Sequence, residues 1–215
     1  MSQQDTLDVI YEAVLAGDAN ATTAAVNQAL AEGITADAIL NDACIQAMDE
    51  VGAQFEEGEK FVPEMLISAR AMSAAMTILR PLLIEAGVET VGTVVLGTVH
   101  GDLHDIGKNL VGMMLEGAGF EVIDLGTDVP AQKFVDAVQQ YNPDILGMSA
   151  LLTTTTKSMP ATLNALTEAG VRDRVKVIIG GAPITDEYAA KIGADGFAAD
   201  AGSAARVARA LIGLG

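Results

Sequence analysis

Cysteine and basic residues are both scarce in this chain of 215 residues. Its single cysteine, Cys44, allows no internal disulfide, which fits a reducing cytoplasm. Lysine and arginine number 12 against 29 aspartates and glutamates, so the formal net charge is −17. This balance predicts that the protein binds neither nucleic acid nor anionic membranes, because both interactions depend on clustered basic side chains.

Long uninterrupted apolar runs are also missing, although half of the residues are hydrophobic. Asp, Glu, Gly or Thr interrupts each apolar stretch before it reaches the roughly 18 residues of a membrane span. The opening residues, Met-Ser-Gln-Gln-Asp, lack the basic segment and apolar core of a secretory signal. We therefore expect a soluble, cytoplasmic protein, and the length fits two small domains.

In the first part of the chain, apolar residues recur at helical spacing and glycines stand where helices should end. Thr35 is a good N-cap, and Pro63 suits a first helical position. The pattern predicts helices over residues 6–16, 18–32, 35–55 and 63–85. Short connections between them favour an antiparallel four-helix bundle, and we expect this helical domain to span residues 1–88.

After Val88 the pattern changes to short β-branched runs, each followed by a segment of helical length. The predicted strands are residues 93–99, 121–125, 145–149, 175–179 and 196–199. Five strands alternating with helices are typical of an α/β, flavodoxin-like (Rossmann-like), doubly wound parallel sheet. We expect this second domain to span residues 89–215. Its ligand site should lie in the loops after strands one, three, four and five.

The loop after the first predicted strand, residues 97–109, contains both histidines of the chain, His100 and His104. It is not a phosphate-binding P-loop, because five residues separate Gly101 from Gly107 and Asn109 replaces the hydroxyl residue that follows the lysine. The dinucleotide pattern Gly-x-Gly-x-x-Gly is also missing from this turn.

Three other interpretations of the loop stay open. His100 and His104, with Asp102 and Asp105, offer nitrogen and oxygen ligands for a divalent metal. Asp102, His104 and Ser149 could form a hydrolase triad, although Ser149 lacks the glycines of a nucleophile elbow. A histidine simply hydrogen-bonded to a neighbouring carboxylate is the plainest interpretation. It leaves unexplained the small and hydroxyl residues in the other loops at the same sheet edge.

Three separated motifs in this half resemble the signature of cobalamin-binding domains. They are Asp102-Leu-His104-Asp-Ile-Gly107, Ser149-Ala-Leu151 and Gly180-Gly181. Upstream, Val51-Gly52, Phe55-Glu-Glu-Gly58, Phe61-Val-Pro63 and Ser68-Ala69-Arg70-Ala-Met72 are similar to the helical cap of methionine synthase and corrinoid methyltransferase proteins. The resemblance covers nearly the whole chain.

The resemblance implies roles for individual residues. His104 would coordinate the cobalt of cobalamin from below, Asp102 would accept the hydrogen of its other ring nitrogen, and Thr155 would complete the relay. The cofactor-binding residues implied in the second domain are Asp102, Leu103, His104, Asp105, Ile106, Gly107, Ser149, Leu151, Thr153, Gly180, Gly181 and Ala201. In the helical cap, Phe61, Met65 and Met72 would cover the upper face, although the methionine spacing suits a bundle core slightly better.

The resemblance further implies a methyl carrier that alternates between methylcobalamin and cob(I)alamin, or a related corrinoid. Its partners would be a substrate-specific methyltransferase, a second methyltransferase acting on a thiol or tetrahydrofolate, and a reductive activase. Such a carrier would not turn over alone and would serve methanogenesis or anaerobic one-carbon metabolism. The cobalamin-binding subunit of a radical mutase and a cobalamin-dependent sensor are the alternatives. The first generally lacks the helical cap, and the second normally carries a DNA-binding module.

Overall fold

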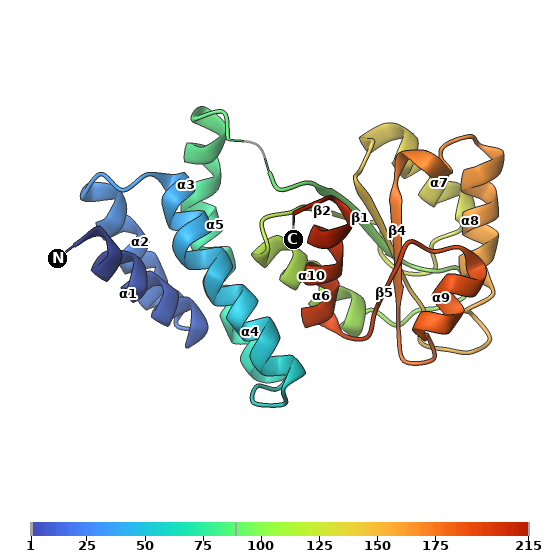
Figure 1. The fold of residues 1–215 in the computed structure, drawn as a ribbon, viewed down its shortest axis with the longest axis horizontal. Helices are drawn as coiled ribbons and strands as arrows, with labels where there is room; N and C mark the ends of the chain where they lie inside the picture. The colour runs from blue at the N-terminus through green and yellow to red at the C-terminus, as the bar shows by residue number, and fades with distance from the viewer. Residues whose placement is uncertain (1, 89, 215) are drawn as a thin grey trace. The chain divides into compact units, whose positions relative to one another are not determined.

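The computed structural model describes residues 2–88 and 90–214. It contains two compact units, one built mainly from the residues up to Val91 and the other mainly from Gly92 onward (Figure 1). The first unit is helical, and the second is an α/β unit around a five-stranded parallel sheet. The fold class predicted from the sequence is therefore confirmed.

The helical unit follows the predicted order of helices, with one local difference. Its elements are α1 (Gln3–Leu15), α2 (Ala19–Ala31), α3 (Ala36–Ile39), the π-helix η1 (Leu40–Ile45), α4 (Gln46–Glu56) and α5 (Val62–Glu85). Together α3, η1 and α4 occupy the place of the single predicted helix over residues 35–55. A π-helical turn widens the backbone, and the spacing of apolar residues alone does not reveal it.

Side-chain caps fix the starts of these helices. Ser2 and Asp5 form a capping box, so α1 begins three residues before the predicted start. The Asp18 carboxylate caps α2, and the Thr35 hydroxyl accepts from the Ala38 amide at the start of α3. Gly17 ends α1 with a φ of +74°, and the Ile67 side chain of α5 fills the space where a Cβ would stand. That close approach requires glycine.

α5 is long enough and apolar enough, by length and composition only, to cross a membrane, despite the charged residues that interrupt it. It is the one such helix in the described residues. Core helices of globular domains meet the same criterion, and one stripe of α5 is buried. Within this stripe the Ser68 hydroxyl donates to the Leu15 carbonyl of α1 at 3.1 Å, so the stripe faces the other helices of the same unit.

The sheet of the second unit has the strand order β2-β1-β3-β4-β5, and all of its pairings are parallel. The strands are β1 (Thr93–Thr98), β2 (Glu121–Asp124), β3 (Ile145–Ser149), β4 (Lys176–Gly180) and β5 (Gly196–Ala198). Each lies within one residue of its predicted position. This order is that of the flavodoxin-like fold.

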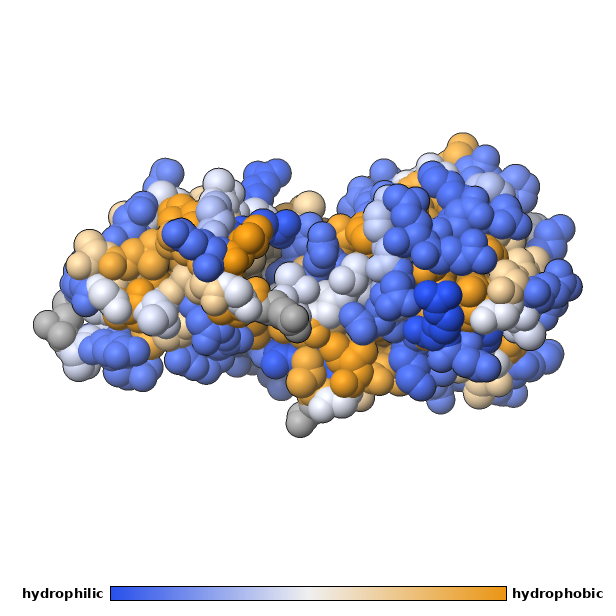
Figure 2. All heavy atoms as spheres, turned by 90° about the horizontal axis from the view of Figure 1, so that it is seen from above, coloured by the Kyte–Doolittle hydropathy of each residue, from blue (hydrophilic) through white to orange (hydrophobic). Residues whose placement is uncertain are grey.

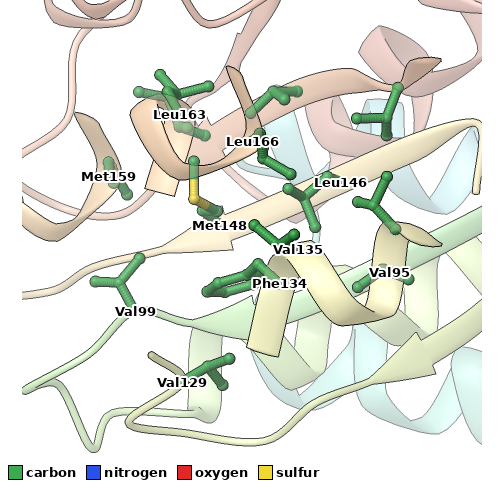
Figure 3. Close-up of a cluster of buried hydrophobic side chains, with 14 of the residues drawn as sticks. Val95, Val99, Val129, Phe134, Val135, Leu146, Met148, Met159, Leu163 and Leu166 are labelled. Atoms are coloured by element: carbon green, nitrogen blue, oxygen red, sulfur yellow. The ribbon is translucent and has the colours of Figure 1, made fainter. Parts of the chain in front are cut away.

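Helices cover both faces of the sheet. They are α6 (Ile106–Gly117), α7 (Ala131–Tyr141), α8 (Ser158–Glu168), α9 (Asp186–Ile192) and α10 (Ala201–Leu211), with a 3₁₀ turn η2 (Arg172–Arg174) before β4. Figure 1 shows α6 and α10 on one face and α7, α8 and α9 on the other. On the latter face, Phe134 of α7 and Met159 of α8 pack on Val95 and Met148 of the sheet (Figure 3).

Hydrophobic side chains also reach the surface of both units, in patches between hydrophilic ones (Figure 2). The most exposed large ones in the α/β unit are Leu103 and Ile106, at 73% and 78%. Both belong to the segment between β1 and the first turn of α6. An apolar patch there needs an explanation, because single exposed side chains are ordinary but clusters of them mark binding sites.

Candidate functional site

The candidate site lies at the carboxyl edge of the sheet, where the loops after the parallel strands meet. The loop after β1 turns at Gly101, which has a φ of +85°, and residues 102–105 have no regular secondary structure before α6 begins at Ile106. The loop after β3, residues 150–157, lies beside it, because β1 and β3 are neighbours in the sheet.

Asp102 is the centre of a hydrogen-bond network between these two loops. Its side chain is fully buried, and its Oδ1 lies 2.7 Å from His104 Nδ1. Oδ2 accepts from the Leu151 amide at 2.8 Å and from the Thr155 hydroxyl at 2.7 Å. The structure thus brings together His104, Asp102 and Thr155, which are 53 residues apart at their extremes.

The surroundings of Asp102 keep its carboxyl group ionised. Burial alone raises the pKa of this group, but hydrogen bonds from Thr155, His104 and the Leu151 amide outweigh it and hold the pKa well below the usual range. A carboxylate can only accept, so the nearby Nδ1 of His104 must carry the hydrogen. The lone pair of the neutral imidazole is then on Nε2, which has no hydrogen-bond partner among the described residues.

His104 is half-exposed, with 52% of its side chain accessible, so Nε2 is open to a ligand. Exposed apolar side chains lie in the two loops that meet here: Leu103 and Ile106 from its own loop, and Leu151 and Leu152, whose amides donate to Asp102, from the loop after β3. A Cβ added at Gly107 would meet no atom within 4 Å, so open space adjoins the first turn of α6. A coordinating nitrogen, an apolar rim and open space suit a large, flat, partly apolar ligand.

The two alternatives built on the same residues find no support in the geometry. His100 pairs with Asp128 and His104 with Asp102, and no group of three potential ligands that could hold a bare metal ion occurs in the described parts of the chain. The Ser149 hydroxyl has no hydrogen bond to His104 within residues 2–88 and 90–214, so Asp102, His104 and Ser149 do not form a hydrolase triad.

The other predicted residues of the α/β unit are distributed along the same edge. Ser149 ends β3, paired with Thr98 and Gly180, and Thr153 is exposed in the following loop. At Gly181, φ is +129° and a Cβ would stand 1.9 Å from the Ala150 carbonyl oxygen, so backbone packing alone requires this glycine. Ala201 is buried in the first turn of α10, and Asp105 is exposed just before α6.

The three residues predicted to cover the cofactor from the cap differ in exposure. Phe61 is 65% exposed at the start of α5. Met65 and Met72 are buried in the stripe of α5 that also contains Ser68, so the structure places them in the helical core. In this structure they have essentially no surface to offer a cofactor, and the bundle-core interpretation of their spacing describes them.

Lys108 is a buried cation beside the site, in the first turn of α6. It forms an ion pair with Asp124 at the end of β2, and its Nζ donates to Asn109 Oδ1 at 2.7 Å. A buried ammonium group needs such partners because its desolvation is costly. The pair fastens the start of α6 to the end of the neighbouring strand.

Sequence reasoning missed the contribution of the loop after β2. Asp128 in that loop contacts His100, Gly101 and the backbone of Asp102. The sequence predicts the ligand site in the loops after the other four strands, but in a parallel sheet the loop after β2 lies at the same edge. The polar residues Thr127 and Asp128, three and four residues after the end of β2, were the available signal.

Fold and site together define a doubly wound α/β protein that presents a carboxylate-held imidazole at the carboxyl edge of its sheet. Two family models match, both described as a B12 binding domain, one over residues 92–210 and the other over residues 6–80. The first covers more than half of the chain. The chain therefore belongs to the B12-binding domain family, and the resemblance drawn from its motifs is confirmed.

Curated relatives agree with this membership. A dimethylamine corrinoid protein of Methanosarcina barkeri is 40% identical over 213 residues, 99% of this chain and 100% of the relative. A trimethylamine corrinoid protein of Methanosarcina acetivorans is 41% identical over 196 residues, 90% of this chain and 91% of the relative. The similarity thus extends over both units and not over the α/β unit alone.

Solved structures show the same. A cobalamin-binding protein of Desulfitobacterium hafniense matches with a TM-score of 0.83 and 37% identity, covering 96% of this chain and 98% of the other. A chain of the methanol:cobalamin methyltransferase complex of Methanosarcina barkeri matches with a TM-score of 0.84 and 30% identity, covering 97% and 80%. The prediction of a cobalamin-binding protein with a helical cap is confirmed by these matches and the family models.

Proposed function

We propose that this protein carries a methyl group on the cobalt of a bound corrinoid between two methyltransferases. When bound, the corrinoid supplies a cobalt ion that accepts a methyl group and gives it up again. The similarity over both units to corrinoid proteins named for dimethylamine and trimethylamine carries this proposal. The match over 97% of this chain to a chain of the methanol:cobalamin methyltransferase complex supports a methyltransferase as the partner that loads the carrier.

His104 is the proposed lower ligand of the cobalt. Its Nε2 is the nitrogen with an available lone pair, because the ionised Asp102 holds the hydrogen on Nδ1. Such carboxylate–histidine pairs are typical of metal-binding histidines, since the carboxylate fixes both the tautomer and the ring orientation. Asp102 and Thr155 would hold the imidazole and its Nδ1 hydrogen in the orientation that this coordination needs.

The remaining residues of the edge are proposed to hold the cofactor. The apolar rim of Leu103, Ile106, Leu151 and Leu152 would contact the ligand around His104, and Gly107 would leave it space. The tail of the cofactor would lie along Ser149, Thr153, Gly180, Gly181 and Ala201. The two glycines are also required because a Cβ at either position would come too close to a neighbouring backbone carbonyl. In the helical domain, residues 1–88, the exposed Phe61 is the proposed contact to the upper face.

The finer parts of the proposal concern the partners. The methyl donor is the substrate of the loading methyltransferase, a methylated amine or another small methylated compound, and the second methyltransferase acts on a thiol or tetrahydrofolate. A reductive activase restores a carrier whose cobalt has been oxidised. A radical mutase subunit is not favoured, because the relatives that match over the helical unit are corrinoid proteins.

Reconstitution with hydroxocobalamin tests the proposal. We would compare the visible spectrum of the wild-type protein with those of His104→Ala and, as a matched control, His100→Ala. The bound corrinoid of the wild type and of His100→Ala should show the same imidazole-ligated spectrum, and His104→Ala should lose it. Absence of binding by the wild-type chain, or a spectrum unchanged in His104→Ala, would contradict the assignment.

A further inference from the structure

A second histidine–aspartate pair lies on the other side of the His104 loop. His100 Nδ1 is 2.7 Å from Asp128 Oδ1, and the same oxygen accepts from the Gly101 amide at 2.7 Å. The backbone amide of Asp128 in turn donates to the Asp102 carbonyl at 2.9 Å. One residue of the loop after β2 therefore contacts three successive residues of the loop that leads to His104.

The backbone of Asp128 is in a sparsely populated conformation. Its φ is +52°, in the left-handed region, where a residue with a Cβ is strained and only asparagine and aspartate occur with some frequency. Such strain persists only where the surrounding contacts enforce it. Here the enforcing contacts are the two from its carboxylate and the one from its amide, all to the His104 loop.

The two loops run side by side before they reach this point. Val99 and Val129 form an isolated parallel bridge, and their side chains lie on adjacent segments at the edge of the core (Figure 3). Val99 leads directly into His100, and Val129 directly follows Asp128. From the segment after β3, the Ser158 hydroxyl at the start of α8 donates to the His100 carbonyl at 3.0 Å.

The His104 loop depends on such contacts because it has little regular structure of its own. Residues 102–105 belong to no helix or strand. Asp102 fixes the loop from within through the contacts to His104 and to the loop after β3. Asp128 fixes its backbone from outside, one residue before Asp102 and at Asp102 itself.

We propose that Asp128 is a positioning residue that holds the Gly101–Asp102 backbone in the geometry from which His104 presents its imidazole to the cofactor. This inference rests on the proposed role of His104 as a ligand. Asp128 does not contact His104 and acts through the peptide groups of the loop. The contact to the Gly101 amide is the important one, because it holds the loop backbone itself, whereas the contact to His100 joins two exposed side chains and such contacts contribute little.

Asp128→Gly removes the carboxylate without adding strain, since glycine tolerates the left-handed conformation. Asn142→Gly is the matched control. Asn142 also has a positive φ, +46°, and its side chain also accepts one strong hydrogen bond, from Arg174 at 2.6 Å. It lies just before β3, at the opposite edge of the sheet. Asp128→Asn keeps an acceptor for the Gly101 amide, and His100→Gln removes the imidazole alone.

The first measurement needs no cofactor: amide hydrogen exchange of residues 100–105 in the cofactor-free protein. In Asp128→Gly we expect exchange of this loop to accelerate by about tenfold, as for loss of a hydrogen bond to a charged acceptor. Asn142→Gly should leave it within about twofold, and Asp128→Asn should restore most of the protection. Unchanged exchange in Asp128→Gly would overturn the proposal.

The second measurement is the imidazole-ligated fraction of bound hydroxocobalamin, read from the visible spectrum. It should fall in Asp128→Gly by severalfold, recover in Asp128→Asn, and change little in His100→Gln and Asn142→Gly. Faster amide exchange in the loop with an unchanged imidazole-ligated fraction would overturn the positioning role and show that Asp128 only stabilises the loop. If the wild type itself showed no ligation by His104, the proposed function would fail, and the exchange result would still decide whether Asp128 holds the loop.

Discussion

Asp102 shows how a single buried charge can organise a site. An isolated buried carboxylate would be costly, and this one is stabilised because every contact it makes is with a donor. The same contacts couple three separate properties, namely the tautomer of His104, the ordering of the loop after β3 and the ionisation of Asp102 itself. A change at one donor should therefore be felt by all three.

Thr155→Val is the sharpest single test of this coupling, because it removes the hydroxyl and nearly keeps the shape. We expect the cofactor-free protein to lose about 1 to 3 kcal/mol of unfolding free energy, since a buried carboxylate loses a donor. Urea denaturation at neutral pH measures the loss. Thr155→Ser keeps a hydroxyl and should recover most of the stability. An unchanged Thr155→Val together with a destabilised Thr155→Ser would show that the methyl group matters and the hydrogen bond does not.

The low pKa of Asp102 has a pH dependence of definite sign. A carboxyl group whose pKa is lower in the folded state stabilises the fold above its unfolded value, near about 4, and loses that contribution as the pH falls further. The stability of the wild type should therefore fall below about pH 4 more steeply than that of Asp102→Asn. Urea unfolding midpoints of both proteins, measured at about four pH values between pH 3 and pH 7, would show this difference. Parallel curves would contradict the assignment.

At the scale of the elements, the strands were predictable and the contacts between loops were not. Each strand is a short apolar run between turn residues, and this local signal placed β3 correctly at both ends. The bond from the Gly101 amide to Asp128 depends on β2 lying beside β1 in the sheet, which no local pattern states. Likewise, the π-helical turn η1 depends on how the helices pack, and Met65 is buried for the same reason.

Gly181 and Gly193 illustrate two different reasons why a loop position requires glycine, namely a positive φ and a lack of space for a Cβ. Both have a positive φ, but a Cβ at Gly181 would overlap the Ala150 carbonyl, whereas one at Gly193 would meet nothing within 4 Å. We expect Gly193→Ala to cost about 1 to 2 kcal/mol from backbone strain alone. Gly181→Ala should cost more, about 3 kcal/mol or above, because the loops after β3 and β4 must move apart. Chemical denaturation of both variants makes the comparison, and equal costs would refute the overlap.

At the scale of the whole molecule, the α/β unit has a core of its own on the α7–α8 face of its sheet. Among the described residues, the buried cluster there runs from Val95 to Ala189 and contains side chains of this unit alone. A unit with its own hydrophobic core can in principle fold alone. The separate contributions of the two domains to folding and cofactor binding can therefore be tested directly.

A fragment of residues 89–215 should fold on its own and bind hydroxocobalamin with a spectrum that depends on His104. Circular dichroism and a cooperative urea transition would establish folding, and the spectrum would establish ligation. The proposed role of Phe61 predicts that the corrinoid bound to this fragment is more accessible to light and oxidants than that of the full chain. A fragment that folds but ignores the His104→Ala change would contradict the assignment of the lower ligand to this unit.

The one cysteine of the chain acquires a chemical meaning from its burial. Cys44 is wholly covered in η1, and desolvation raises the pKa of its thiol to about 12, so no thiolate forms at neutral pH. Thiolates are the strongest nucleophiles among protein side chains, and an accessible one could intercept a methyl group in transit. Because its single thiol is protonated and buried, the protein does not methylate its own cysteine, and the methyl group stays available for the partner.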